Sequence, residues 1–150
     1  MIRKAQIQEV PEIRRMLVEF AQTGDVLPRT LADIYSQLRD FLVFREDEGP
    51  LVGIAALHIC WDGLGEIRSL VVAQEHQRQG IGSRLVAECL AEARKLGLKQ
   101  VFVLTTSPPF FERFGFRKVP KESLPPIVWA DCVDCVKFPD CDEVPLILEL

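Results

Sequence analysis

The stretch from Leu70 to Val86 has the residue types and spacing needed to hold an anion. Leu70, Val71 and Val72 are apolar and end in β-branched residues, which is typical of a buried strand. From Ile81 onward apolar residues recur at helical spacing, and Gly97 stands where that helix would end. Between the two segments the chain reads Gln77-Arg78-Gln79-Gly80-Ile81-Gly82-Ser83. This order predicts a strand, a polar loop and a glycine-rich entrance to a helix.

Gly80 and Gly82 favour phosphate as the anion. The first amide groups of a helix have no partner within it and carry the positive end of the helix dipole. An anion approaches them closely when no Cβ is in the way, and Arg78 and Arg84 would add positive charge. Ser83 and Arg84 follow the last glycine, so the loop matches neither G-x-x-x-x-G-K-[ST] nor G-x-G-x-x-G. The alternative is a structural turn whose glycines only permit close packing.

Composition limits the classes of protein to consider. The chain has 150 residues, a length that predicts one domain over residues 1–150, and its net charge of −4 argues against a nucleic-acid partner. No apolar run is long enough to span a membrane and no signal peptide is recognised, so we expect a cytoplasmic protein without a membrane partner. Five cysteines, an odd number, do not suggest a disulfide framework.

The alternation and turn signals predict an α/β protein. Strands are expected at Ile2–Ile7, Phe41–Arg45, Leu51–Cys60, Glu66–Val72, Gln100–Thr105, Phe116–Val119 and Val144–Leu150. Helices are expected from Val10, from Thr30 to about Leu38, from Ile81 to Leu96, and from Pro108 to Phe114. The strand–helix–strand unit predicts a parallel pair, and the earlier hairpins predict antiparallel ones. The result is a mixed, mostly antiparallel sheet of about seven strands with helices on both faces.

Three segments carry a resemblance to a known family. Gln77-x-x-Gly80-x-Gly82, between a strand and a helix, resembles the [RQ]-x-x-G-x-[GA] pyrophosphate loop of the GNAT acetyltransferases. The order of elements resembles the GNAT fold along essentially the whole chain, and the segment Phe111–Phe116 resembles the F-[YF]-E-x-x-G-F segment of that family. The run from Gly97 to Thr106, with Leu124-Pro125 further on, is similar to the acetyltransferase domain of bacterial N-acetylglutamate synthases.

The resemblance implies an acetyl-CoA-dependent N-acetyltransferase that needs no metal for its chemistry. Its implied acceptor is the α-amine of L-glutamate, the entry step of arginine biosynthesis. Another small amine or a protein N-terminus is an alternative acceptor, and a non-catalytic acyl-CoA-binding regulatory module is an alternative of another class. We expect a small amine partner, taken to be an amino acid, and leave a homodimer open.

Acetyl-CoA as cosubstrate would contact mostly backbone. The cofactor-binding residues that the resemblance implies are Leu70, Val71, Val72, Gln77, Arg78, Gln79, Gly80, Ile81, Gly82 and Ser83. Leu70 and Val72 would pair with the pantetheine, and a strand amide near Leu70 or Val71 would stabilise the oxyanion.

Glu66 is the expected catalytic residue. A free α-amine is mostly protonated near pH 7, and a carboxylate can take its proton directly or through water. Strand alternation predicts that Glu66, Arg68 and Leu70 share one face. The tyrosine that many family members use as an acid corresponds here to Phe111, and the only tyrosine is Tyr35.

Water or the threonine pair Thr105 and Thr106 would therefore assist the thiolate leaving group. Arginine matches carboxylate geometry, so Arg29 and Arg68 are expected to bind the substrate together with Thr105. The synthases have an Arg-x-Ser near the start of the last strand, whereas this chain has Cys141-Asp142-Glu143, which leaves the identity of the amino acid in doubt.

Cys132, Cys135 and Cys141 are the remaining unusual feature. C-x-x-C can begin a zinc site, but tetrahedral zinc needs four ligands, so we predict free thiols, with a metal site or a reversible disulfide as alternatives. We interpret His58, in an apolar strand, as a histidine with satisfied hydrogen bonds rather than as a catalyst, and expect His76 to be exposed.

Overall fold

A computed structural model of the chain describes residues 1–22, 29–132 and 143–150, with residues 130–132 described by their backbone alone. Contacts divide the chain into two compact units, described separately below. The first contains residues 1–58 and 67–92, and the second contains residues 59–66 and 93–150. The strand β3 (Leu51–Trp61), the strand β4 (Leu64–Val72) and the helix α3 (Ile81–Leu96) each contribute residues to both units.

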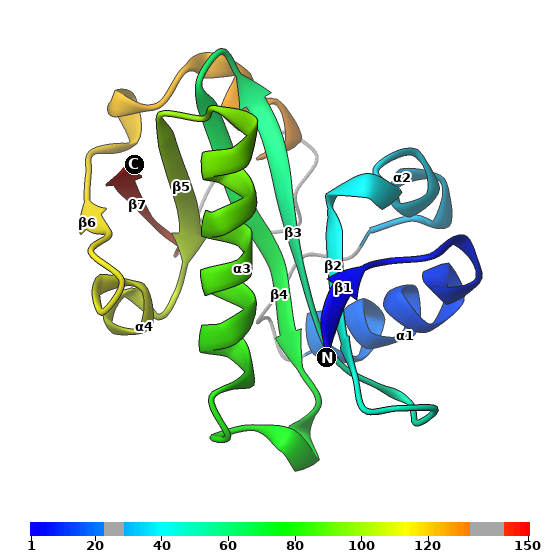
Figure 1. Cartoon of the computed structure of the whole chain (residues 1–150). Helices are drawn as coiled ribbons and strands as arrows, with labels where there is room; N and C mark the ends of the chain where they lie inside the picture. The colour runs from blue at the N-terminus through cyan, green and yellow to red at the C-terminus, as the bar shows by residue number, and fades with distance from the viewer. Residues whose placement is uncertain (23–28, 133–142) are drawn as a thin grey trace. The chain divides into compact units, whose positions relative to one another are not determined.

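The strands form one sheet in the order β1-β2-β3-β4-β5-β7-β6 (Figure 1). Its strands are β1 (Ile2–Lys4), β2 (Phe41–Arg45), β3 (Leu51–Trp61), β4 (Leu64–Val72), β5 (Gln100–Thr105), β6 (Arg117–Lys118) and β7 (Val144–Glu149). β4 and β5 are parallel, while the pairs β1–β2, β2–β3, β5–β7 and β6–β7 are antiparallel. The predicted mixed, seven-stranded sheet is therefore confirmed.

The helices begin where the sequence signals place them. They are α1 (Val10–Ala21), α2 (Leu31–Ser36), α3 (Ile81–Leu96) and α4 (Pro108–Glu112), with 3₁₀ turns η1 (Ile7–Glu9), η2 (Leu38–Asp40), η3 (Gln74–His76), η4 (Lys121–Ser123) and η5 (Pro126–Cys132). Pro11 lies in the first turn of α1, where its missing N–H costs no hydrogen bond. The Thr30 hydroxyl accepts a hydrogen bond of 3.0 Å from the Asp33 amide and so caps α2.

Neighbouring residues of β3 show that helices cover both faces of the sheet in the first unit. Ile54 belongs to a core with Ile13 and Leu17 of α1 and Ile34 of α2. A Cβ on the preceding residue, Gly53, would lie 3.0 Å from the Leu85 side chain of α3. Successive side chains of a strand point to opposite faces, so α1 and α2 cover one face and α3 covers the other.

The second unit is built around β5. Gln100 to Thr105 pair with Glu149 to Val144 of β7, and Phe102 packs with Leu64, Leu124 and Ile147. Gly115, with φ 98, closes the α4 turn, as expected for a residue in the left-handed region.

Several predicted boundaries were wrong for local reasons. The first strand ends at Lys4 rather than Ile7, because Ile7 to Glu9 form a 3₁₀ turn stapled by a hydrogen bond from the Gln6 amide to Glu9 Oε1 (2.8 Å). β4 begins at Leu64 rather than Glu66, because Gly63 (φ 74) completes the turn before it. The strand predicted at Phe116–Val119 is reduced to Arg117–Lys118.

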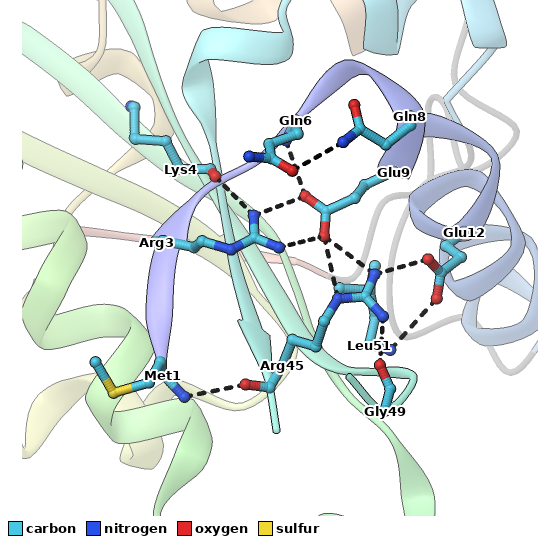
Figure 2. A network of polar contacts seen from close by, with 10 residues as sticks. All are labelled: Met1, Arg3, Lys4, Gln6, Gln8, Glu9, Glu12, Arg45, Gly49 and Leu51. Carbon is cyan, nitrogen blue, oxygen red and sulfur yellow. Dashed lines mark hydrogen bonds and ion pairs between the residues drawn. The ribbon is translucent and has the colours of Figure 1, made fainter. Parts of the chain in front are cut away.

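Glu9 is a buried charged residue at the centre of an ion network in the first unit (Figure 2). Arg3 of β1 makes two parallel hydrogen bonds of 2.8 Å to the Glu9 carboxylate. Arg45 of β2 donates to Glu9 Oε2 at 3.0 Å and to Glu12 Oε1 at 2.7 Å, and also bonds the Gly49 carbonyl. The hydrogen bonds from Arg3, with those from the Gln6 amide and Arg45, outweigh the effect of burial and lower the pKa of Glu9 to about 2.

Cys89 lies on the buried face of α3, with none of its side chain exposed. Burial raises the pKa of its thiol to about 12, because the apolar surroundings disfavour the thiolate.

The Glu9 network predicts how stability depends on pH. The pKa of Glu9 falls from an ordinary 4.5 to about 2 on folding, so its contribution is complete above pH 4.5 and is lost as the pH falls toward 2. That contribution is about 3 kcal/mol. We expect Glu9→Gln to lower the free energy of unfolding by about 3 kcal/mol at pH 7 and by much less near pH 2.5. Urea titrations at both pH values measure this.

Glu19→Gln, on an exposed position of α1, is the matched control and should leave the pH dependence as it is in the wild type. Parallel loss of stability by wild type and Glu9→Gln on acidification would contradict the role given to Glu9.

Candidate functional site

The start of α3 has the geometry of an anion site. The Gly80 carbonyl accepts the first helical hydrogen bond, from the Arg84 amide at 3.1 Å, so the amides of residues 81 to 83 form the first helical turn. Such amides have no intrahelical partner. Gly80 has φ 80, and a Cβ built there would meet nothing within 4 Å. The backbone conformation at Gly80 therefore favours glycine, and the space beside the turn is open.

Arg78 also lies in the left-handed region, with φ 67. Two such residues within three positions turn the chain sharply between the end of β4 and the start of α3. Arg78 is exposed at this turn, where its charge can reach an anion. Arg84 was expected to add charge as well, but its guanidinium lies 5.0 Å from the centre of the Phe44 ring, a cation–π distance.

Gln77 has a structural role that its sequence pattern did not reveal. Its Nε2 donates a hydrogen bond of 3.0 Å to the Val72 carbonyl, and the Ala73 amide donates to the Val52 carbonyl at 2.7 Å. These two bonds attach the first part of the loop to the sheet, one to β4 at Val72 and one to β3 at Val52. The side chain of Gln77 thus holds the loop, while the amides after Gly80 are the groups that face outward from the helix.

β4 loses its regular alternation at Ser69, which has φ 57. Arg68 donates to Gln37 Oε1 at 2.6 Å, and Val71 packs in the core beneath α1 and α2, so both lie on that face although they are three residues apart. A residue with positive φ inserts the extra step, as in a β-bulge. The prediction that Leu70 shares a face with Arg68 assumed unbroken alternation, which Ser69 interrupts, and it stays a prediction.

Glu66 lies in the part of β4 that pairs with β5, in register with Phe102, and its side chain is half-buried. Thr105 ends β5, where its hydroxyl accepts a hydrogen bond of 2.9 Å from the Ser107 amide and shapes the entry to α4. Phe111 is buried in α4, and Tyr35 is exposed on α2. Arg29 is half-buried just before the Thr30 cap.

His58 makes the interaction that was expected of a satisfied histidine. Its Nδ1 lies 2.6 Å from Asp40 Oδ2, and the two side chains are 31% and 23% exposed. Asp40 and Gln37, the partners of His58 and Arg68, were missed by sequence reasoning. Nothing in the sequence marks them, because the chain fold alone brings the η2 turn beside β3 and β4.

His76 is half-buried rather than exposed, and it lines a cavity of about 550 Å³. Residues of α1, the start of β3 and the segment from Ala73 to His76 form its walls. The cavity is a second feature that the sequence did not predict.

Of the predicted cysteine cluster, Cys135 and Cys141 lie outside the described residues, as does the side chain of Cys132. Among the residues that are described, no three His, Cys, Asp or Glu side chains are grouped to hold a metal ion.

A sequence model of the acetyltransferase (GNAT) family matches residues 10–116, which include α1, the Gly80 turn and α4. The chain belongs to the GNAT acetyltransferase family. It is 35% identical over 149 residues to an uncharacterized N-acetyltransferase of Chlorobaculum tepidum, covering 99% of this chain and 96% of that one. It is 36% identical over 121 residues to an amino-acid acetyltransferase of Mycobacterium tuberculosis, covering 79% of this chain and 68% of the relative.

This GNAT protein also matches a solved structure over 100% of its length, the N-acetylglutamate synthase of Neisseria gonorrhoeae complexed with coenzyme A and N-acetyl-glutamate. The TM-score is 0.88 and the identity 27%, and the match covers 35% of that longer chain. The protein is thus an N-acetyltransferase that uses acetyl-CoA as its cosubstrate. No helix in the described part of this GNAT chain is long and apolar enough to cross a membrane.

The Gly80 turn predicts the effect of a substitution on acetyl-CoA binding. Gly80→Asp places a carboxylate beside the helix amides, where it competes with the pyrophosphate for the same hydrogen bonds. We expect at least a tenfold loss of acetyl-CoA affinity by calorimetry, with the far-UV circular dichroism unchanged.

Gly97→Asp is the matched control, because Gly97 has nearly the same backbone conformation (φ 83) and open surroundings at the other end of α3. It shares the backbone strain of Gly80→Asp but should bind acetyl-CoA as the wild type does. Equal affinity of the two variants would show that the Gly80 turn is not the phosphate site.

Proposed function

We propose that this protein transfers the acetyl group of acetyl-CoA to the α-amine of L-glutamate, as in the first step of arginine biosynthesis. The observation that carries this proposal is the likeness, along the whole chain, to a synthase complexed with coenzyme A and N-acetyl-glutamate. The amino-acid acetyltransferase of M. tuberculosis supports the same class of acceptor.

The amides of Ile81, Gly82 and Ser83 would bind the pyrophosphate of the cosubstrate, with Arg78, Gln79 and Gly80 forming the rest of the loop. The pantetheine would pair with the end of β4 through Leu70 and Val72. Gln77 Nε2 donates to the Val72 carbonyl at 3.0 Å, and the Val72 amide would be the group that pairs with the pantetheine. This pairing would align the thioester with the strand.

Glu66 would take a proton from the acceptor ammonium, directly or through one water. The neutral amine then attacks the thioester carbonyl, whose developing oxyanion is stabilised by an amide near Leu70 or Val71. The C–S bond breaks and coenzyme A leaves as a thiolate. A thiol has an ordinary pKa of about 8.5, so water suffices to protonate the thiolate, and Phe111 has no proton to give.

Arg29, Arg68 and Thr105 are the proposed substrate contacts. Arg68 donates to Gln37 Oε1 at 2.6 Å, and its guanidinium would bind a carboxylate of the substrate. The Thr105 hydroxyl oxygen accepts one hydrogen bond, from the Ser107 amide at 2.9 Å, and its O–H would donate to the substrate.

A different small amine or a protein N-terminus is the second candidate acceptor, favoured by the acidic Asp142 and Glu143 where the synthases have Arg-x-Ser. A regulatory module that binds acyl-CoA without catalysis is the third candidate. The single domain over residues 1–150, the cytoplasmic location, the open question of a homodimer and the state of Cys132, Cys135 and Cys141 remain predictions from the sequence.

The proposed acceptor is tested by measuring coenzyme A release from acetyl-CoA with each of the twenty amino acids. We expect L-glutamate to give the highest kcat/KM. A higher value with another amine would select the second candidate, and tight acetyl-CoA binding without release would select the regulatory module.

Glu66→Gln tests the proposed base. We expect kcat to fall by about 10² to 10⁴, while acetyl-CoA affinity stays within twofold of the wild type. Glu75→Gln, at an exposed position of η3, is the control and should leave kcat unchanged. Full activity of Glu66→Gln across the pH range would remove Glu66 from the mechanism.

A further inference from the structure

Arg78 has a backbone conformation that contacts within the chain do not explain. Its φ of 67 lies in the left-handed region, which glycine adopts without strain and a residue with a long side chain seldom adopts. The side chain is exposed, and it makes no hydrogen bond or ion pair with the residues that the structure describes. The fold therefore carries a strained residue at 78 without gaining a described contact from its guanidinium.

The other arginine at this turn is placed differently. The Arg84 guanidinium lies 5.0 Å from the centre of the Phe44 ring, and Phe44 of β2 is buried. Arg84 thus packs against the sheet through a cation–π contact. Of the two arginines beside the Gly80 turn, Arg78 is the one whose guanidinium extends into solvent beside the first turn of α3.

Acetyl-CoA carries two kinds of phosphate. Its diphosphate links the pantetheine to the ribose, and a phosphomonoester is attached to the 3′ carbon of the same ribose. A phosphomonoester has a charge of about −2 near pH 7, and a guanidinium can bind it through two parallel N–H···O bonds. The amides after Gly80 would hold the diphosphate, so the monoester is the phosphate that still needs a cation.

The position of Arg78 fits this second phosphate. Arg78 lies two residues before Gly80, and the 3′-phosphate is separated from the diphosphate by only one sugar ring. The pantetheine would run along the end of β4, so the nucleotide leaves the turn toward solvent, where Arg78 is exposed. Strained backbone conformations concentrate at sites that bind ligands, which gives the left-handed arginine a reason that the fold lacks.

We propose that Arg78 binds the 3′-phosphate of acetyl-CoA and so selects this cosubstrate over its dephospho form. The inference rests on the proposed function, since it takes the amides after Gly80 as the diphosphate site. It deepens that function by giving one side chain the recognition of a phosphate that the helix amides do not reach.

Arg78→Gly tests the proposal, because it removes the guanidinium and also relieves the backbone strain. Coenzyme A and dephospho-coenzyme A differ only in the 3′-phosphate, so calorimetry with both ligands isolates that group. We expect coenzyme A affinity to fall by about tenfold or more, while dephospho-coenzyme A affinity stays within about twofold. The midpoint of thermal unfolding should equal or exceed that of the wild type, which separates lost recognition from a damaged fold.

Two control variants separate charge and strain from recognition. Asp47→Gly relieves a left-handed residue (φ 46) in the turn between β2 and β3, and Arg14→Gln removes an exposed positive charge from α1. Both should bind the two ligands as the wild type does. A loss of coenzyme A affinity in Arg14→Gln as large as that in Arg78→Gly would show an effect of net charge alone and would overturn the inference.

The inference is also overturned if Arg78→Gly binds coenzyme A with wild-type affinity, or if it weakens both ligands by the same factor. An equal loss would place Arg78 at the diphosphate or in the loop's own structure.

These titrations contain no acceptor, so their outcome is distinct from failure of the proposed function. A protein that acetylates no amine but loses its preference for coenzyme A in Arg78→Gly lacks the proposed activity and keeps the inference. A protein that acetylates L-glutamate, and whose wild type and Arg78→Gly variant prefer acetyl-CoA over its dephospho form equally, keeps the activity and loses the inference.

Discussion

The helix α3 can offer its first amides to an anion only because the chain reaches it through a backbone path that most residues avoid. Arg78 and Gly80 both have positive φ, at 67 and 80, and between them the chain leaves β4 and enters the helix within a few residues. At Gly80 the absence of a Cβ removes the cost of this conformation. Arg78 bears it as a non-glycine residue, a strain that surrounding bonds must hold in place.

The hydrogen bonds that hold this turn in place are made by residues 73 to 77, before Arg78. The Gln77 side chain and the Ala73 amide each attach to a strand, at the Val72 and Val52 carbonyls, so the loop has little freedom before the left-handed residues begin. In the same unit the carboxylate of Glu9, the residue just before α1, accepts hydrogen bonds from Arg3 of β1 and Arg45 of β2. These bonds join α1, which covers the face of the sheet opposite α3, to the two strands. The η2 turn, which positions Arg68 and His58, leads directly into β2. Phosphate binding at the Gly80 turn would therefore depend on contacts made within the first unit.

The sequence predicted what is local. Glycine spacing, proline in the first turn of α1 and Thr30 as a cap each act within a few residues, and the corresponding helix starts are confirmed. What it missed depends on contacts between distant segments. Arg45 reaches Glu9 across 36 positions, Arg68 reaches Gln37 across 31, and no pattern along the chain encodes such partners. Alternation along β4 is also a local rule, and one positive φ at Ser69 interrupts it.

The burial of Cys89 has a practical consequence for experiments on this protein in solution. Thiolate is the reactive form of cysteine, and a thiol with a pKa of about 12 and no exposed surface offers almost none of it. A sulfhydryl reagent can modify Cys89 only when local or global opening exposes its thiol, so the rate of its labelling depends on how often the buried face of α3 opens. Cys89 is thus a built-in probe for the opening of α3, the helix whose first turn would hold the cosubstrate.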